Sequence, residues 1–226
     1  MGTLHVVATP IGNLGDISQR AEQVLRSAQV VVAEDPRHSR RLLDHLGIRP
    51  QMISLPAPRE AERIGKVLAA LEGVDVALIS DAGTPGISDP GRRLVAAARA
   101  AGHQVLAIPG PSAVVAAVAA SGLRADRFAF LGFLPRTRGR MARVLGSAPD
   151  LALVFFEAPQ RLPATLSLCA ELLPDRQLAV AREISKLHES WHLGTAAELA
   201  AQFRSTPARG ECTVVVEAPP RDTRRG

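Results

Sequence analysis

Short apolar runs alternate with segments of helical spacing along the first half of the chain, and this alternation limits the possible folds more than any other feature. Runs rich in valine, leucine and isoleucine are typical of strands buried on both faces of a sheet. Strands that alternate with helices predict a mostly parallel sheet covered by helices on both sides. Pro36 suits the first turn of the second helix, and Gly47 suits its end. The expected strands are Leu4–Thr9, Gln29–Glu34, Met52–Leu55, Val74–Ser80 and Gln104–Ile108, and the expected helices are Ser18–Ala28, Arg37–Leu46, Arg59–Glu72, Arg92–Ala101 and Ser112–Ala120.

The regular alternation of strands and helices breaks off around Ser121–Asp126. We therefore expect two α/β domains, residues 1–121 and residues 122–226. In the second half, some predicted strands follow one another without a helix, which indicates a mixed sheet. Thr195–Glu198 fits a capping box and marks a helix start. The polar and basic segment Pro219–Gly226 is expected to fray. The expected strands are Phe128–Phe133, Leu151–Phe156, Gln177–Arg182, Leu187–Leu193 and Cys212–Glu217, and the expected helices are Arg138–Leu145, Pro159–Leu172 and Thr195–Phe203.

The segment Ser80–Gly91 directly follows the apolar run Val76–Ile79 and contains three glycines and two prolines. These residues force turns, so no helix can begin at once. Connections between strands and helices are usually about 2–6 residues long, and this one is longer and carries two carboxylates. In open parallel sheets, ligands bind just outside the carboxyl ends of the strands. We therefore predict a binding loop here.

Three further loops follow predicted strands of the same sheet. Each of them alone is an ordinary turn. Because the carboxyl ends of parallel strands lie at one edge, the four loops together predict a cleft there. The three further loops are Thr9–Asp16, Ala33–His38 and Pro109–Ala113.

The net charge of +5 suits an anionic partner, and nucleic acid is the foremost class. Nearly all the basic residues are arginines, a bias that genome composition also produces. Aromatic residues make up 3% of the chain and tyrosine is absent, so stacking platforms for bases are few. The charge favours RNA without establishing it. Two arginine clusters follow predicted strands, namely Arg37, Arg40 and Arg41, and Arg136, Arg138, Arg140 and Arg143.

The stretch His188–His192 matches the HExxH pattern of zinc peptidases, which requires a helix. The alternation across Leu187–Leu193 is that of a strand, which places both histidines on one face and Glu189 on the other. The capping box starts the next helix only at Thr195. We predict a chance match and no metal site.

Other catalytic and nucleotide-binding fingerprints are absent from the sequence. No GxGxxG follows the first strand, and no GxxxxGK[ST] or GxSxG occurs. Cys169 and Cys212 lack metal-ligand spacing and are expected to be buried thiols in a reducing compartment. No apolar run is long enough to span a membrane, and the amino terminus lacks the pattern of a secretory signal. We expect a cytoplasmic protein with no membrane contact.

The four loops resemble the tetrapyrrole-methylase superfamily, and within it the bacterial enzymes that methylate a cytidine 2′-oxygen in small-subunit ribosomal RNA. The resemblance covers nearly the whole chain. Pro36 stands where the family usually has Thr, and Phe156, Ala158 and Gln160 stand where it usually has Tyr, Ser and His. Four further segments carry the resemblance, namely Gly132–Pro135, Phe155–Arg161, Ala181–Lys186 and Arg209–Glu211.

The resemblance implies S-adenosylmethionine bound in a cleft between two α/β domains, a class III methyltransferase fold and a homodimer. The candidate substrate-binding residues are Asn13, Arg37, Arg40 and Arg136. The implied cofactor contacts are Pro10, Asp81, Ala82, Gly83, Thr84, Ile87, Ser112, Ala113, Phe156, Glu157 and Arg182.

The hypothesis is in-line transfer of the sulfonium methyl group to a ribose 2′-oxygen, driven mainly by orientation. Such a transfer needs no metal, and a base near the hydroxyl would assist it. Two alternatives stay open, namely methylation of a corrinoid or porphyrin precursor and a non-catalytic RNA- or ribosome-binding role. The candidate catalytic residues are Asp35, His38, Glu157, Glu183 and Lys186.

Overall fold

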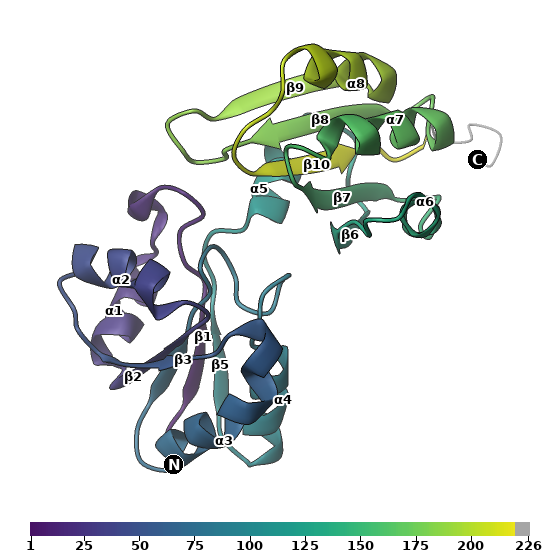
Figure 1. Cartoon of the computed structure of the whole chain (residues 1–226). Helices are drawn as coiled ribbons and strands as arrows, with labels where there is room; N and C mark the ends of the chain where they lie inside the picture. The colour runs from purple at the N-terminus through teal and green to yellow at the C-terminus, as the bar shows by residue number, and fades with distance from the viewer. Residues whose placement is uncertain (220–226) are drawn as a thin grey trace. The chain divides into compact units, whose positions relative to one another are not determined.

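The computed structural model describes residues 1–219, and the chain falls into two compact units that meet between Ser112 and Ala113 (Figure 1). The boundary lies earlier than the expected 121/122, because helix α5 (Ala113–Ala120) packs on strands of the second unit. The segment that we expected to fray lies outside the described residues from position 220 onward. No helix in the described part of the chain is long and apolar enough to cross a membrane.

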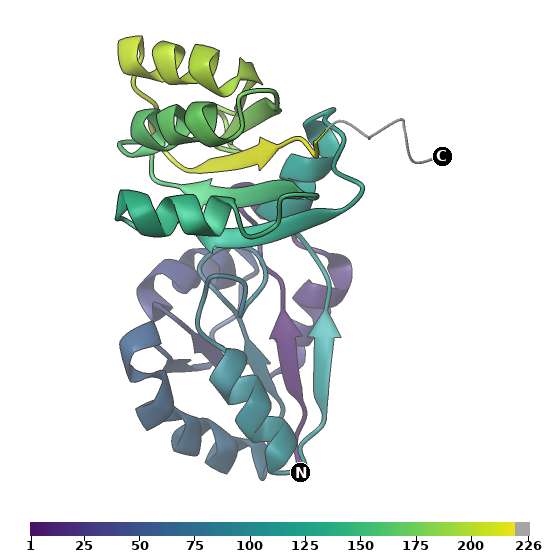
Figure 2. The ribbon, with the colours of Figure 1, turned by 90° about the vertical axis from the view of Figure 1, so that its right-hand side faces the viewer.

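The first unit is a parallel five-stranded sheet of order β3-β2-β4-β1-β5. Figure 2 shows β1 (purple) and β5 (teal) side by side and pointing the same way. This confirms the parallel sheet predicted from the alternation. The strands are β1 (Leu4–Val7), β2 (Val30–Ala33), β3 (Gln51–Ser54), β4 (Val76–Leu78) and β5 (Val105–Ile108), and the α-helices are α1 (Gln19–Ser27), α2 (Pro36–His45), α3 (Glu60–Leu71) and α4 (Arg92–Ala100). Two 3-10 turns, Leu14–Asp16 and Ala57–Arg59, complete the unit.

Helices cover both faces of this sheet. Along β2, Val30 and Val32 pack into a core with α3 and α4, whereas Val31 and Ala33 pack into a core with α1 and α2. Successive side chains of a strand point to opposite faces, so an all-apolar strand fits a sheet that is buried twice.

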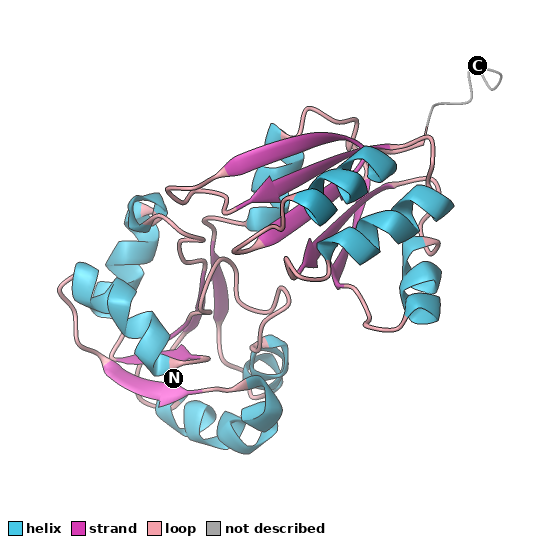
Figure 3. Cartoon of the chain, turned by 45° about the horizontal axis from the view of Figure 1, so that its top comes forward, coloured by secondary structure: helices cyan, strands magenta, loops and turns pink. Residues whose placement is uncertain are grey.

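The second unit contains a mixed five-stranded sheet of order β6-β7-β10-β8-β9. β6 and β7 are parallel, and the other neighbours are antiparallel, as predicted. Leu153 and Phe155 of β7 pack with α6, α7 and α8, while Ala152 and Val154 pack with α5. Figure 3 shows helices (cyan) on both faces of this sheet (magenta). The strands are β6 (Phe128–Phe133), β7 (Ala152–Glu157), β8 (Gln177–Arg182), β9 (Ser190–Thr195) and β10 (Cys212–Val216), and the further helices are α6 (Arg138–Leu145), α7 (Leu162–Leu172) and α8 (Ala196–Ser205).

Local capping signals are confirmed at several helix ends. The Ser18 hydroxyl accepts the N–H of Ala21 at the start of α1. Thr195 and Glu198 form the predicted capping box at α8. Helix α7, however, begins at Leu162 rather than at the expected Pro159, because the preceding residues form a turn.

The HExxH stretch does not form a helix, but the strand prediction was only partly correct. β9 begins at Ser190, so His188 and Glu189 lie before it in a turn. Residues Glu183 and Ser185 have φ values of 51° and 70°, which turn the chain away from a strand. The described residues contain no group of three or more potential ligands that could hold a metal ion.

Both cysteines are buried, free thiols, as predicted. Burial raises the pKa of Cys169 to about 12 and that of Cys212 to about 11. Such thiols stay protonated and are poor nucleophiles.

Candidate functional site

The loops that follow β1 and β4 are joined by backbone hydrogen bonds at the carboxyl edge of the first sheet. The N–H of Thr9 donates to the carbonyl of Gly83 at 2.8 Å, and the N–H of Gly83 donates back at 3.1 Å. The Thr9 hydroxyl is buried and donates to the carbonyl of Ser80 at 3.2 Å. β1 and β4 are neighbours in the sheet, so these bonds extend their pairing beyond the strands.

The other two predicted loops are tied to the same edge. The Thr84 hydroxyl donates to the carbonyl of Pro111 at 3.4 Å, which joins the loop after β5. The N–H of Asp35 donates to the Asp81 carboxylate at 3.4 Å, which joins the loop after β2. All four loops therefore converge, as the parallel sheet predicted.

Three carboxylates at this edge, those of Glu34, Asp81 and Asp89, lie close enough to affect one another. Burial, helped by the charges of Glu34 and Asp81, raises the pKa of Asp89 to about 6. Burial and the charges of Asp81 and Asp35 raise the pKa of Glu34. Within residues 1–219, no ion pair connects these three carboxylates to a basic side chain. The edge thus carries uncompensated negative charge that favours a cationic ligand.

Asp35 caps α2, since its carboxylate accepts the N–H of Arg37 at 2.9 Å and also pairs with the Arg37 guanidinium. These hydrogen bonds lower the pKa of Asp35, which makes it a poor base near neutral pH. His38 and Arg40 follow on α2 and are exposed. Asn13 is also exposed and caps the turn after β1 by accepting the N–H of Gly15.

The predicted cofactor residues of the first unit differ in exposure. Pro10 and Gly83 are buried, whereas Ala82 is exposed and Ile87 keeps 45% of its surface accessible. Asp81, Thr84 and Ser112 are half-buried, and Ala113 begins α5 in the second unit.

The predicted residues of the second unit gather at one edge of the mixed sheet. Cys212 at the start of β10 pairs with Glu157 at the end of β7 and with Arg182 at the end of β8. Phe133 at the end of β6 pairs with Phe156. The ends of these three strands and the start of β10 therefore coincide.

Glu157 is fully buried, and both of its carboxylate oxygens are occupied. One oxygen accepts the Thr165 hydroxyl at 2.6 Å. The other accepts the N–H of Ala158 at 2.9 Å and pairs with Arg161 at 3.3 Å. Charge-assisted bonds of this kind hold a carboxylate in place. We therefore drop Glu157 as a candidate base and leave only its backbone as a possible ligand contact.

Glu183 and Lys186 pair with each other, which argues against either of them accepting a proton. The Lys186 ammonium donates to Glu183 and to Glu211, at 2.8 Å each. The hydrogen bond from Lys186 lowers the pKa of Glu183. For Lys186, burial acts to lower the pKa, but the hydrogen bonds to the two carboxylates outweigh it and raise the pKa. Arg182 beside them donates to the carbonyl of Arg209 and to the Ser190 hydroxyl.

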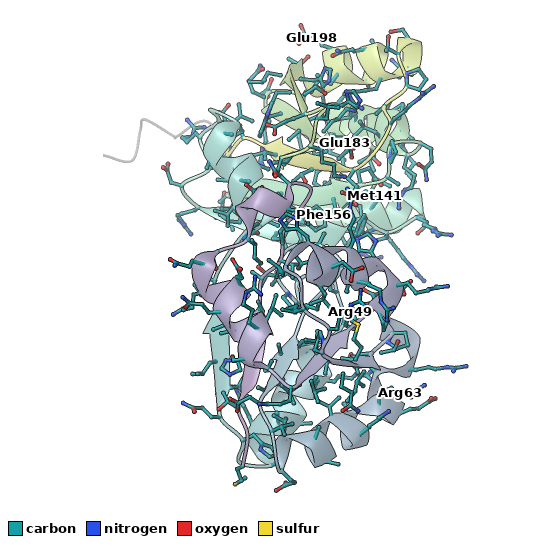
Figure 4. All side chains as sticks on the ribbon, turned by 90° about the vertical axis from the view of Figure 1, so that its left-hand side faces the viewer. Arg49, Arg63, Met141, Phe156, Glu183 and Glu198 are labelled. Carbon is teal, nitrogen blue, oxygen red and sulfur yellow. The ribbon has the colours of Figure 1, made fainter. Side chains whose placement is uncertain are left out.

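Phe156 packs against Phe130 and Phe133, with ring centroids 5.0 and 5.4 Å apart. Arg136 is exposed in the loop after β6, at the same edge of the sheet (Figure 4 labels Phe156 and Glu183). The second unit thus brings Arg136, Phe156 and Arg182 to a common edge.

Sequence reasoning missed two acidic residues that shape the first edge. Asp89 was noted only as a carboxylate in the loop, and Glu60 was not singled out. The Glu60 carboxylate accepts the N–H of Gly91 at the end of the Ser80–Gly91 loop and the N–H groups of Arg93 and Leu94 in the first turn of α4. No local sequence signal marks this contact, since an acidic residue is common in the first turn of any helix.

A model of the Tetrapyrrole (Corrin/Porphyrin) Methylases matches residues 3–200 of the chain. The chain belongs to this family. This methylase is also similar over nearly its whole length to proteins named Ribosomal RNA small subunit methyltransferase I. That of Xylella fastidiosa is 46% identical over 96% of this methylase and 81% of its own length. That of Thermotoga maritima is 42% identical over 96% of this methylase and 98% of its own length.

Solved structures of methyltransferases share the fold of this methylase. Cobalt precorrin-4 methyltransferase superposes with a TM-score of 0.71 at 16% identity, covering 95% of this methylase and 94% of that chain. Uroporphyrin-III C-methyltransferase from Thermus thermophilus, complexed with S-adenyl homocysteine, superposes with a TM-score of 0.66 at 20% identity, covering 96% and 97%. The predicted class, two α/β domains of the tetrapyrrole-methylase type, is confirmed.

Proposed function

We propose that this methylase transfers a methyl group from S-adenosylmethionine to the ribose 2′-oxygen of a cytidine in small-subunit ribosomal RNA. The observation that carries this proposal is the similarity, over nearly the full chain, to proteins named Ribosomal RNA small subunit methyltransferase I. The relative from Pseudomonas aeruginosa is 47% identical over 95% of this chain and 78% of its own length.

The charge at the edge of the first sheet suits this cofactor. S-Adenosylmethionine carries a sulfonium and an ammonium group, and it supplies an electrophilic methyl group when bound. Asp81, Asp89 and Glu34 offer negative charge that no basic side chain of the described residues neutralises in an ion pair. A cationic ligand would relieve the repulsion among these carboxylates.

The four converging loops would hold the cofactor mainly through their backbone. We assign this role to Pro10, to Ala82–Thr84 and to Ser112, with Asp81 facing the positive charge and Ile87 offering an exposed apolar surface. The hydrogen bonds between the loops fix their backbone before a ligand arrives. Preorganisation of this kind lowers the entropic cost of aligning the reacting atoms.

For the proton of the 2′-hydroxyl, we favour the one candidate of the five that is held in no hydrogen bond or ion pair within residues 1–219. Asp35, Glu157, Glu183 and Lys186 are all held in hydrogen bonds or ion pairs. The His38 ring is exposed, and no hydrogen bond to it occurs in the described part of the chain. We therefore retain His38 as the candidate proton acceptor.

We infer the substrate and the oligomeric state from the relatives and from the family resemblance. The exposed arginines Arg37, Arg40 and Arg136 supply positive charge for the RNA. We further propose a homodimer in the cytoplasm. The tetrapyrrole alternative is not favoured, since the methyltransferases of tetrapyrrole precursors are matched at much lower identity than the ribosomal RNA methyltransferases.

A substrate comparison tests the proposal. The protein is incubated with tritiated S-adenosylmethionine and either small ribosomal subunits, large subunits or a tetrapyrrole precursor. Label in the RNA of small subunits alone is expected. Label in the tetrapyrrole would support the alternative chemistry, and cofactor binding without any transfer would point to a binding protein.

A further inference from the structure

A hollow opens beside the carboxyl end of α2, where the chain turns back into β3. Gly47 has a φ of 68° and donates its N–H to the carbonyl of Asp44 at 3.0 Å, while Ile48 donates to Leu43 at 2.9 Å. These two bonds form a Schellman motif, which reverses the chain directly after the helix. The motif brings Ile48 and the residues after it back alongside the last turn of α2.

The hollow has an apolar floor and a charged rim. Its volume is about 180 Å³. Leu43 on the floor is buried and Met52 is half-buried, whereas Arg40, Asp44 and Arg49 are exposed at the rim. Figure 4 labels Arg49 beside α2. Pockets for drug-sized ligands measure about 300–1,000 Å³, so this hollow suits one planar ring rather than a whole cofactor.

A row of arginines leads from the candidate site to this hollow. α2 starts at the carboxyl edge of the sheet, where Asp35 caps it. Arg37, Arg40 and Arg41 lie three and four residues apart and therefore on one side of the helix. The ten residues of α2 rise about 15 Å, a length that spans on the order of four phosphates in a stacked strand. Neither Arg40 nor Arg49 forms an ion pair within residues 1–219.

We propose that the hollow binds one unpaired nucleotide of the RNA substrate, on the order of four nucleotides away from the nucleotide that is methylated. This inference rests on the proposed function. The base would lie on the apolar floor, and the guanidinium groups of Arg40 and Arg49 would stack on it or bind the adjoining phosphates. Asp44 would accept a hydrogen bond from an exocyclic amino group. Arginine planes thereby take the place of the aromatic residues that are scarce in this chain.

Variants that change the charge and the floor separately test the proposal. Arg40→Gln/Arg49→Gln removes two positive charges at the rim, and Lys66→Gln/Arg99→Gln removes two exposed charges from α3 and α4 as a matched control. Met52→Ala removes part of the floor without a change in charge, and Met52→Leu restores an apolar side chain. Thermal unfolding shows that each variant folds. Each is assayed for its KM and kcat with small subunits and for affinity to a short unstructured RNA, intact or with one abasic position.

The rim variant is expected to raise the KM for small subunits roughly tenfold, with kcat and cofactor affinity unchanged, while the control changes the KM much less. Met52→Ala is expected to weaken binding of intact RNA more than that of abasic RNA, and Met52→Leu to recover the difference. Equal effects of the two charge pairs, or equal binding of intact and abasic RNA by the parent protein, would overturn the proposal. In that case methyl transfer to small subunits by the parent still supports the proposed function. A parent protein that binds neither form of the short RNA and transfers no methyl group to small subunits would refute both proposals.

Discussion

The carboxylate of Glu60, the first residue of α3, accepts the backbone N–H of Gly91, the residue directly before α4, at 3.1 Å. The same oxygen accepts two more N–H groups from the first turn of α4. The first N–H groups of a helix have no partner inside it, and a glycine offers no side chain to cap them. A residue at the start of α3 thus anchors the end of the loop that we assign to the cofactor.

Replacing Glu60 is expected to weaken both stability and cofactor binding. Glu60→Ala leaves buried N–H groups without a partner, at a cost of about 1–3 kcal/mol. For a protein of this size, each kcal/mol lowers Tm by roughly 2–4 °C. Calorimetry and a titration with S-adenosylmethionine measure the two effects. Glu62→Ala, an exposed position on the same helix, serves as the control. Equal Tm values for the two variants would contradict the anchoring role.

Asp89 is expected to make cofactor binding depend on pH. Its pKa is raised to about 6, first by burial and then by Glu34 and Asp81. Below this pH the carboxyl group is neutral and attracts a cationic ligand less, so affinity should fall as the pH drops from 7 to 5. Asp89→Asn should flatten that dependence and weaken binding at pH 7. Isothermal titration at several pH values measures this, and an unaltered pH profile in the variant would contradict it.

Asp89 is also expected to make the stability of the fold depend on pH. The folded-state pKa of Asp89 lies above the unfolded value of about 3.9, so the protonated group stabilises the fold and this contribution is lost as the pH rises through about 6. Asp89→Asn should therefore raise Tm at pH 7.5 and leave it nearly unchanged at pH 4. Asp175→Asn, at an exposed position, is the control. A lower Tm for Asp89→Asn at pH 7.5 would be the opposite of the expected result.

Asp81 is expected to be essential for cofactor binding but not for folding. Asp81 is half-buried, and the hydrogen bond that its carboxylate accepts from the N–H of Asp35 is long at 3.4 Å. Asp81→Ala should weaken binding of S-adenosylmethionine by more than roughly tenfold and keep the Tm of the parent. Because one repelling charge is removed, the pKa of Asp89 should also fall, which NMR titration can follow. An unchanged dissociation constant would remove Asp81 from the site.

Gly210 is expected to tolerate no side chain. It has a φ of 79°, and a Cβ atom there would overlap the carboxylate of Glu183. Gly210→Ala should displace that carboxylate from Lys186 and lower Tm. Gly139→Ala, on α6 with open space around it, should raise Tm slightly because alanine favours a helix by about 0.5–1 kcal/mol. Thermal unfolding of both variants measures the contrast, and equal shifts would contradict the close approach at Gly210.

Periodicity was sufficient to predict most of the fold and the meeting of the four loops. The burial of β2 on both faces and the parallel order of the first sheet follow from apolar runs separated by helices. The division between Ser112 and Ala113 could not be read from the sequence, because α5 consists entirely of alanine and valine and shows no polar face. Only the packing of α5 on β7 and β10 shows that this helix belongs to the second unit.

The rest of the site depends on contacts between residues far apart in the sequence. Glu157 looks like a free carboxylate in its motif, yet Thr165 and Arg161 occupy it one or two helical turns later. The turn at Glu183 depends on Gly210, which lies on another segment. The hydrogen bonds and ion pairs of these side chains are made with residues that are distant in the sequence, so no local pattern reveals them.

The identity of the methylated nucleoside is the most direct test of the account. Small ribosomal subunits from a strain that lacks this methylase are incubated with the protein and tritiated S-adenosylmethionine, and the RNA is digested to nucleosides. The account predicts that the label elutes as 2′-O-methylcytidine. Label in a base-methylated nucleoside, or no label although the cofactor binds, would contradict it.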